Sequence, residues 1–148
     1  MSAVTIRRGT PTDWPHVGDS FFRSYHTSPH ARGTPAKVLA EALDSLLGSP
    51  QWVLWVACAT EEPSEILGWL LARIGVPQRA AWCFVKPIWR GKGVGRALVR
   101  HAGITAGEVE VAFLEPEVAK WVKAKGLVLR LRPHLVAVTA YDAGKAVA

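Results

Sequence analysis

The amino-acid sequence predicts an α/β fold with about seven strands in one sheet and four flanking helices. Short runs rich in Val, Leu and Trp alternate with segments whose apolar residues recur every three or four positions, and Gly or Pro separates most of them. The chain has 148 residues, of which 49% are apolar, which is enough for one well-buried core and too little for two domains of usual size. We therefore expect residues 1–148 to form one domain.

Two helices are predicted in the first third of the chain, after a short strand. Thr10 or Thr12 can cap the first helix, and Pro11 suits its first turn. The second helix has apolar residues at helical spacing and stops at Gly48. The predicted elements are a strand over 4–7, a helix from about 11 to 25, a polar, proline-broken loop over 23–35 and a helix over 35–47.

The next two strands, over 52–59 and 66–74, are too apolar to be half exposed. A charged turn joins them as a hairpin. Strands of this composition are usually covered on both faces by helices. We therefore expect them at the centre of the sheet, with Trp52, Trp55 and Trp69 in the core or in a pocket wall.

The second half of the chain is predicted to hold four strands and two helices. Pro116 opens the second of these helices and Gly126 ends it. In order, the elements are a strand over 80–85, a helix from 94 to about 107, a strand over 109–114, a helix over 117–125, a closing hairpin with strands over 127–132 and 134–140, and a frayed tail over 142–148.

The stretch from Trp82 to Val99 has the pattern of a strand, a tight turn and the start of a helix. Three glycines stand at alternate positions in the turn and three cations surround them, namely Gly91, Gly93, Gly95, Arg90, Lys92 and Arg96. Glycines let the backbone take positive φ values and come close to a bulky group. The helix would aim its free N–H groups and the positive end of its dipole at that group. The pattern predicts a phosphate-binding site.

Two other glycine-rich phosphate motifs do not match the spacing. A P-loop needs Ser or Thr after its Gly-Lys pair, and neither follows Gly91-Lys92. The dinucleotide fingerprint Gly-x-Gly-x-x-Gly/Ala has Arg96 in its third place when counted from Gly91, and Leu98 when counted from Gly93. An ordinary glycine-rich connection between a strand and a helix is the remaining alternative.

The stretch Val85-x-Pro87-x-Trp89-Arg90-Gly91-Lys92-Gly93-Val94-Gly95-Arg96-Ala97-Leu98 resembles the acetyl-CoA-binding signature of the GNAT family of N-acyltransferases, Arg/Gln-x-x-Gly-x-Gly/Ala after the fourth strand. Arg90, Gly93 and Gly95 occupy its defining places. The predicted order of elements is also the order of that family. The resemblance implies a GNAT-type fold with a mixed, mostly antiparallel sheet. It also implies an enzyme that moves an acetyl or other short acyl group from acyl-CoA to an amine, without a metal.

The resemblance further implies which residues hold acetyl-CoA or another acyl-CoA. Backbone N–H groups of the turn would hold the pyrophosphate, and the strand edge at 83–85 would pair with the pantetheine arm. A backbone N–H near Phe84 or Val85 would polarise the thioester carbonyl. The implied cofactor-binding residues are Cys83, Phe84, Val85, Arg90, Gly91, Lys92, Gly93, Val94, Gly95 and Arg96.

The residues that would transfer protons lie outside the signature. Glu115 ends the fifth predicted strand, where many family members have Asn, and is the best candidate base, although it also suits a helix start. Val122 replaces the tyrosine that protonates the departing thiolate in the family. Tyr25 is a better substitute than Tyr141, which lies beside the predicted tail. A thiolate that leaves unassisted, or a module that binds CoA without transferase activity, are the alternatives.

The acceptor is not named by the sequence. In the family, the connection between the first two helices forms a wall of the acceptor site, which makes Arg23, Ser24 and His26 candidate substrate-binding residues. A solvated surface loop is the alternative. A small-molecule amine, a peptide and a modified DNA base are all compatible acceptors.

The modified base follows from a second, weaker resemblance. It rests on Trp14, on Phe22-Arg23-Ser24-Tyr25, on Ile66-Leu67-Gly68-Trp69 and on Phe84-Val85-Lys86-x-x-Trp89-Arg90. These segments are similar to phage-encoded GNAT-like proteins, some of which are associated with modification of nucleobases in phage DNA. This resemblance would give the protein a nucleic-acid partner.

The net charge of +6 lies entirely in the second half of the chain. Residues 75–148 hold twelve Lys or Arg against five Asp or Glu, whereas residues 1–74 hold six against seven. The excess fits the phosphates of CoA or a nucleic acid, and part of it can be a solvated helix face at Lys120, Lys123 and Lys125.

Two cysteines in apolar runs are better explained as buried thiols in a reducing compartment than as a disulfide or a metal pair. The longest apolar run has eight residues, far too few to span a membrane. We therefore expect a cytoplasmic protein with no membrane partner. The sequence does not decide whether the protein forms a homodimer.

Overall fold

The computed structural model describes residues 3–27, 36–73, 78–104, 107–113 and 116–131. The described residues form one six-stranded sheet and four α-helices. The strands are β1 (Val4–Arg8), β2 (Trp52–Ala59), β3 (Ile66–Arg73), β4 (Gln78–Val85), β5 (Glu108–Phe113) and β6 (Val128–Leu131). The helices are α1 (Trp14–Thr27), α2 (Ala36–Leu47), α3 (Val94–His101) and α4 (Pro116–Ala124), with short 3₁₀ turns η1 (Pro11–Asp13) and η2 (Pro87–Trp89).

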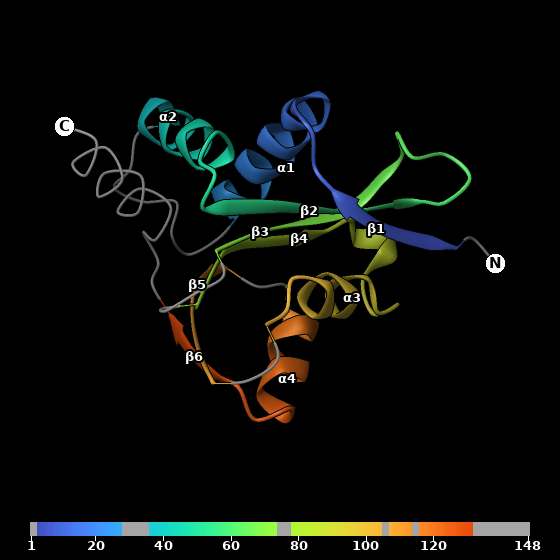
Figure 1. The fold of residues 1–148 in the computed structure, drawn as a ribbon, viewed down its shortest axis with the longest axis vertical. Helices are drawn as coiled ribbons and strands as arrows, with labels where there is room; N and C mark the ends of the chain where they lie inside the picture. Colours follow the sequence, from blue (N-terminus) through green and yellow to red (C-terminus); the bar gives the residue numbers. More distant parts are fainter. Residues whose placement is uncertain (1–2, 28–35, 74–77, 105–106, 114–115, 132–148) are drawn as a thin grey trace.

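The sheet is mixed, and its strand order follows the sequence from β1 to β6. Neighbouring strands from β1 to β4 are antiparallel, whereas β5 runs parallel to both β4 and β6. Figure 1 shows β5 and β6 turning away from the plane of the other strands. The predicted α/β class and mostly antiparallel sheet are confirmed, and the predicted strand over 134–140 lies outside the described residues.

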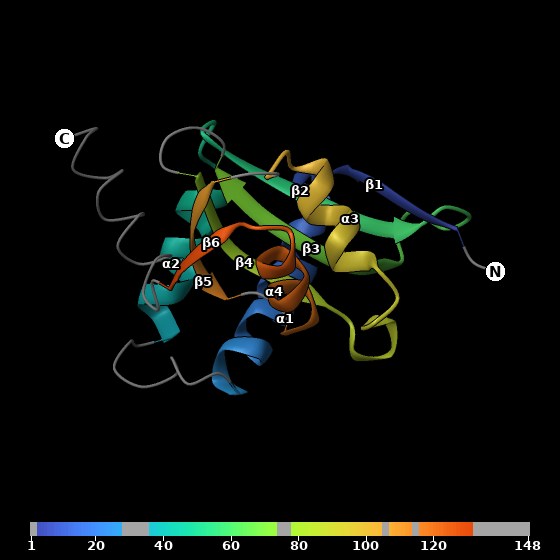
Figure 2. The same cartoon turned by 90° about the horizontal axis from the view of Figure 1, so that it is seen from below.

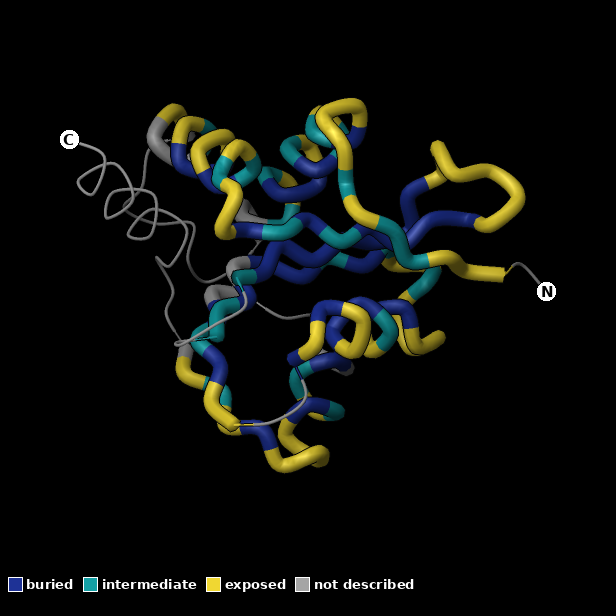
Figure 3. Tube along the Cα trace, in the orientation of Figure 1, coloured by how far each residue is buried: buried dark blue, intermediate teal, exposed yellow. Residues whose placement is uncertain are grey.

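Two helices cover each face of the sheet. The pair α1 and α2 lies on one side, and the pair α3 and α4 lies on the other (Figures 1 and 2). Each face therefore has its own buried cluster, and β2 and β3 are buried along most of their length (Figure 3). This confirms their predicted central place. Trp52 and Trp69 lie in the core between the sheet and α1/α2, while Trp55 is partly buried on the α3/α4 side.

The helix α1 is longer than predicted. Residues 23–27 were expected in a loop, but α1 continues to Thr27. The reason is packing: Val17, Phe21 and Ser24 recur at helical spacing on the face that meets the sheet. Pro29 disfavours helical backbone only in the residue before it, so it does not stop α1 as early as the polar composition of the segment suggested. Residues 28–35 lie outside the described part of the chain.

The helix α3 is shorter than predicted, ending at His101 instead of near Gly107. Gly103 has a φ of 82° and donates its N–H to Arg100 O at 3.0 Å, and Ile104 donates to Val99 O at 3.3 Å. These two bonds form a Schellman motif, which ends helices with a left-handed residue. The buried side chain of Ile104 completes the motif, since it closes back onto the helix.

Two tryptophan–serine hydrogen bonds fix α1 on the sheet. The indole Nε1 of Trp69 on β3 donates to Ser20 Oγ at 2.7 Å, and that of Trp82 on β4 donates to Ser24 Oγ at 2.9 Å. Ser20 and Ser24 are one helical turn apart, so they face the sheet together. Both bonds satisfy a polar atom that core packing would otherwise leave without a partner.

Candidate functional site

A hollow lies where β4 ends and α3 begins. It has a volume of about 260 Å³, counting the part that is open to solvent. Its lining comes from the end of β4, the turn before α3, the first turns of α3 and one residue of α4, namely Val85, Trp89, Arg90, Gly91, Gly93, Gly95, Arg96 and Val118. Six of these eight residues were predicted to bind acyl-CoA, so the turn predicted to bind phosphate lines this hollow.

The start of α3 offers hydrogen-bond donors to this hollow. Gly93 is the N-cap and has no side chain that could cap the helix, and the first bond of the helix is from Ala97 N to Gly93 O at 3.0 Å. The N–H groups of Val94, Gly95 and Arg96 therefore precede the first helical bond. Donors at a helix start, together with the positive end of the helix dipole, favour an anion.

The three glycines of the turn serve two different purposes. Gly91 and Gly93 have φ values of 77° and 86°, a conformation that residues with a Cβ rarely adopt. Gly95 is helical and buried, and a Cβ there would lie 2.1 Å from Cγ2 of Val118 on α4. Gly95 thus allows α4 to pack closely against α3, which the sequence pattern alone did not reveal.

Cations and aromatic rings surround the hollow. Lys92 Nζ lies 5.2 Å from the ring centre of Trp89, within cation–π range. Arg96 is exposed on the first turn of α3. Arg90 donates from Nε to the backbone oxygen of Val85 at 2.9 Å, and its Cζ lies 6.0 Å from the ring centre of Phe84. The lining of the hollow therefore includes two arginines and the ring of Trp89.

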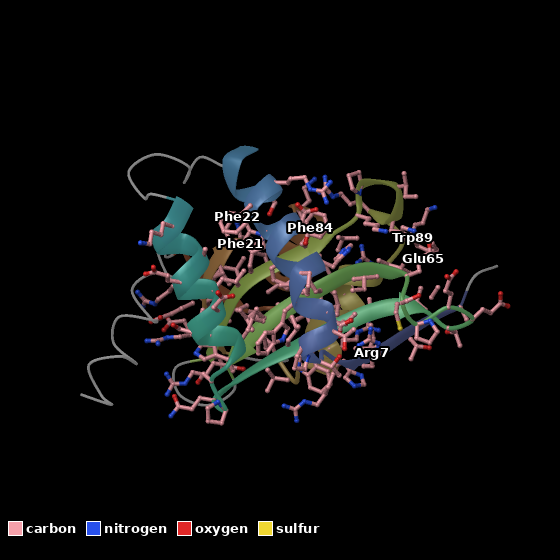
Figure 4. The ribbon with its side chains drawn as sticks, turned by 90° about the horizontal axis from the view of Figure 1, so that it is seen from above. Arg7, Phe21, Phe22, Glu65, Phe84 and Trp89 are labelled. Carbon is pink, nitrogen blue, oxygen red and sulfur yellow. The ribbon has the colours of Figure 1, made fainter. Side chains whose placement is uncertain are left out.

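The end of β4 leads into the hollow, which Val85 lines. Among the described residues, β4 and β5 pair from Gln78↔Val109 to Trp82↔Phe113. Residues 114–115, which follow β5, lie outside the described part of the chain. Phe84 lies on the side covered by α1, beside the loop that carries Trp89 (Figure 4). Cys83 and Val85 point the other way, into the cluster under α3 and α4.

The predicted acceptor residues lie on the last two turns of α1. Arg23 is exposed and pairs with Asp19 at 2.7 Å. Ser24 is half-buried, accepts the indole hydrogen of Trp82 and donates to Phe21 O at 3.0 Å. The hydroxyl of Ser24 thus holds α1 to the sheet. The backbones of Tyr25 and His26 belong to α1, and their side chains lie outside what the structure describes.

The predicted base, Glu115, also lies outside the described residues, after β5 and before α4. Val122, at the place of the family tyrosine, is 1% exposed and packs among the residues between the sheet and α3/α4. It is a core residue with no proton to donate. In the described part of the chain, no group of three or more His, Cys, Asp or Glu residues could hold a metal ion.

Two lining residues were missing from the predicted site. Trp89 lies between the two predicted parts of the site, and its place in the signature as an aromatic next to Arg90 was a usable signal. Val118 comes from α4, more than twenty residues away in the sequence. No local pattern marks it, because its position depends on how α4 packs against Gly95.

The described residues also show the state of the cysteines and the character of the helices. Cys58 and Cys83 are both buried thiols, as predicted. None of the described helices is long and apolar enough to cross a membrane.

Known proteins resemble this chain in sequence pattern and fold. The model of the acetyltransferase (GNAT) family matches residues 16–141. No curated protein matches the chain significantly in sequence. AAC(6')-Iy, solved in complex with the bisubstrate analog CoA-S-monomethyl-acetylneamine, has 19% identity and a TM-score of 0.59, with 85% of this chain and 91% of that chain covered.

Two further solved structures have the same fold. A possible acetyltransferase from Clostridium difficile 630 has 12% identity and a TM-score of 0.62, covering 87% of this chain and 93% of its own. The PaiA N-acetyltransferase from Thermoplasma acidophilum, in complex with coenzyme A, has 14% identity and a TM-score of 0.50, covering 69% of this chain and 70% of its own.

Proposed function

Because the chain belongs to the acetyltransferase (GNAT) family, we propose that its hollow at 85–96 holds the pyrophosphate of acyl-CoA and that an acetyl or other short acyl group passes to an amine. It is an acyl-CoA-dependent N-acyltransferase by family. The observation that carries the proposal is the hollow itself, which joins the uncapped start of α3 to the end of β4.

The described residues suit each part of that cosubstrate. The N–H groups at the start of α3 and the charge of Arg96 would hold the phosphates. The end of β4, which leads into the hollow, would bind the extended pantetheine arm as an added strand. CoA supplies the activated thioester. Holding an amine next to it can contribute roughly 7 kcal/mol or more to catalysis through proximity alone.

We propose a role in the transfer reaction for a backbone N–H group and for two side chains. A backbone N–H of Phe84 or Val85 would polarise the thioester carbonyl. Glu115 would take the proton of the amine, and Tyr25 would donate a proton to the leaving sulfur because Val122 cannot. General acid help is typically worth a factor of 10²–10⁴ in rate. Tyr25→Phe should therefore lower turnover by that range while CoA affinity stays unchanged, with Tyr141→Phe as the control.

Binding of CoA is tested with two glycines at opposite ends of α3. Gly93 and Gly103 have similar φ values of 86° and 82°, and a Cβ at either would meet no atom of the described residues within 4 Å. Substitution by Asp strains both backbones in the same way, but only Gly93→Asp places a negative charge in the hollow. Calorimetry should show CoA binding to the wild type and to Gly103→Asp, and none to Gly93→Asp. Equal binding by both variants would contradict the proposal.

Transfer is separated from binding by a second measurement. An enzyme releases free thiol from acetyl-CoA when an amine is added, whereas a CoA-binding module does not. A panel of small polyamines, peptides and nucleosides with amino groups would identify the acceptor class. We propose a small-molecule amine first, since a protein of the same fold was solved with an analog that joins CoA to acetylneamine.

A second candidate is an acceptor attached to a nucleic acid, which one observation favours. Arg96 and Arg100 are exposed one turn apart, about 6 Å along the axis of α3, and the exposed Lys92 lies in the turn before this helix. None of the ion pairs between described residues involves them. Arg100 lies over the ring of Trp121, with Cζ 5.1 Å from its centre. Cations next to aromatic rings are typical of surfaces that bind nucleic acid.

This candidate is tested by a gel shift with a DNA oligonucleotide at rising salt. A DNA binder loses affinity steeply as salt rises, and Arg100→Glu should weaken it and lower the salt slope by about one unit. Arg130→Glu changes the net charge equally but lies on β6, paired with Glu108, and should have a smaller effect. Absence of any shift at about 50 mM salt would leave the small amine as the acceptor.

A further inference from the structure

The side chain of Arg90 forms a hydrogen bond within the protein that a residue binding phosphate through its charge alone would not need. Its Nε donates to the backbone oxygen of Val85, the last residue of β4, at 2.9 Å. Arg90 follows η2, and the backbone bonds Trp89 N to Lys86 O at 2.8 Å and Arg90 N to Pro87 O at 3.3 Å make that loop compact. The side chain thus reaches back across the loop and joins its end to its beginning.

The same side chain also touches the opposite face of the sheet. Arg90 Cζ lies 6.0 Å from the ring centre of Phe84, at the outer limit of a cation–π contact. The Phe84 ring lies 6.5 Å from that of Trp69, on the side covered by α1. Because the ring contact is long and the hydrogen bond to Val85 is short, the hydrogen bond is the stronger of the two.

We infer that Arg90 is a positioning residue for acyl-CoA, acting through its Nε–H bond to the Val85 carbonyl and not through its charge. This inference rests on the proposed function. The bond fixes the end of β4, where the pantetheine arm would pair, relative to the turn that would hold the phosphates. Both parts line one hollow, so a ligand that spans them needs their spacing fixed, while a ligand that binds only the turn does not.

The hydrogen-bonding role of Arg90 can be separated from its charge by substitution, because side chains of similar length carry their donors at different atoms. The nitrogen used by Arg90 is the atom bonded to Cδ, and glutamine carries its amide nitrogen at the same position. Both are planar N–H donors. Lysine has a methylene group there and holds its charge one atom further, and methionine has neither donor nor charge. Arg90→Gln keeps the donor and loses the charge, whereas Arg90→Lys keeps the charge and has its donor one atom further along the side chain.

The test measures affinities of these variants by calorimetry for two ligands. CoA spans the turn and the strand end, whereas adenosine 3′,5′-bisphosphate lacks the pantetheine arm. Arg90→Met and Arg90→Lys should each weaken CoA by about tenfold, the loss expected for one hydrogen bond. Arg90→Gln should restore CoA affinity to within about twofold of wild type. All variants should bind the bisphosphate within about twofold of wild type, because the turn is unchanged.

The outcomes divide clearly. If Arg90→Lys keeps CoA affinity and Arg90→Gln loses it, Arg90 acts through charge and the inference is overturned. If all variants bind CoA as wild type does, it is overturned while the proposed function stands. If wild type binds neither ligand, the proposed function fails first. Melting temperatures identify a variant that does not fold, and the remaining variants still decide between donor and charge. Weakening that is equal for both ligands also contradicts the inference.

Discussion

The two faces of β4 are built in different ways. On the α3 side, the hollow consists mainly of backbone groups and charges from the 85–96 stretch. On the α1 side, the structure is held by side chains that come from distant segments, such as Trp69 with Ser20 and Trp82 with Ser24. A site made of local backbone can therefore be predicted from a short pattern. A surface made of distant side chains cannot.

The largest expected effect concerns the one place where the α3 side depends on a distant residue. Gly95→Ala would place its Cβ 2.1 Å from Cγ2 of Val118, which is 2% exposed and β-branched, so it has little freedom to move. Overpacking should lower the free energy of unfolding by about 3 kcal/mol. Chemical denaturation measures the loss.

Two controls sharpen this prediction. The Cβ added by Gly18→Ala in α1 would meet no described atom within 4 Å, so this change should raise the free energy of unfolding by about 0.5–1 kcal/mol, because alanine favours helix. The double variant Gly95→Ala/Val118→Ala should cost less than the sum of its single changes, since Val118→Ala makes room for the new methyl group. A simple sum would show that Gly95 and Val118 do not compete for space.

The next effect belongs to the α1 side. Ser20 is 1% exposed and accepts the indole hydrogen of Trp69, which is fully buried. Ser20→Ala leaves that N–H without its acceptor and should cost about 2 kcal/mol of unfolding free energy. Ser24→Ala should cost less, because the bond from Trp82 is only partly buried. CoA affinity should stay unchanged in both, and a loss of CoA affinity in Ser20→Ala would show that the two faces of β4 are coupled.

The sequence predicted the α3 side more fully than the α1 side for physical reasons. Gly93 and Arg96 could be singled out from the local pattern, since a positive φ and a charge at a helix start need no partner from a distant segment. The predicted end of α3 was wrong because apolar residues at helical spacing continue past Gly103. The Schellman hydrogen bonds that end the helix form only in the folded chain. Similarly, polar composition predicted a loop at 23–27, but these residues are helical because α1 packs on the sheet.

The hydroxyl of Ser24 illustrates the limit of residue type as a guide. Ser24, near the start of the polar segment 23–35, was a candidate substrate-binding residue because the family resemblance places this connection at the acceptor site. In the fold it accepts from Trp82, a residue almost sixty positions away. Nothing in the local sequence distinguishes a serine that binds substrate from one that satisfies a buried indole. The same limit applies to Val118, whose place in the hollow depends on α4 packing against α3.

The smallest expected effect is a pH dependence of stability at the start of α1. Burial lowers the pKa of His16 below its ordinary value of 6.5, with Lys86 and Arg23 adding to the shift. Its Nε2 is buried, and no described residue forms a hydrogen bond with it. The fold therefore favours neutral His16. As pH falls through about 6.5, the unfolded chain takes up a proton that the folded chain does not, so stability falls towards the lower folded pKa. The change is modest because His16 is partly exposed.

A second acid step should follow at lower pH and separate cleanly from the first. The Arg7 guanidinium, 2.7 Å from Asp13, holds the pKa of that carboxyl below its ordinary value of 3.8. Its contribution is therefore present above about 3.8 and is lost as pH falls further. Urea denaturation from pH 8 to pH 3 should show both steps in the wild type. His16→Gln should flatten only the upper step and Asp13→Asn only the lower one, and an upper step that persists in His16→Gln would assign it to another group.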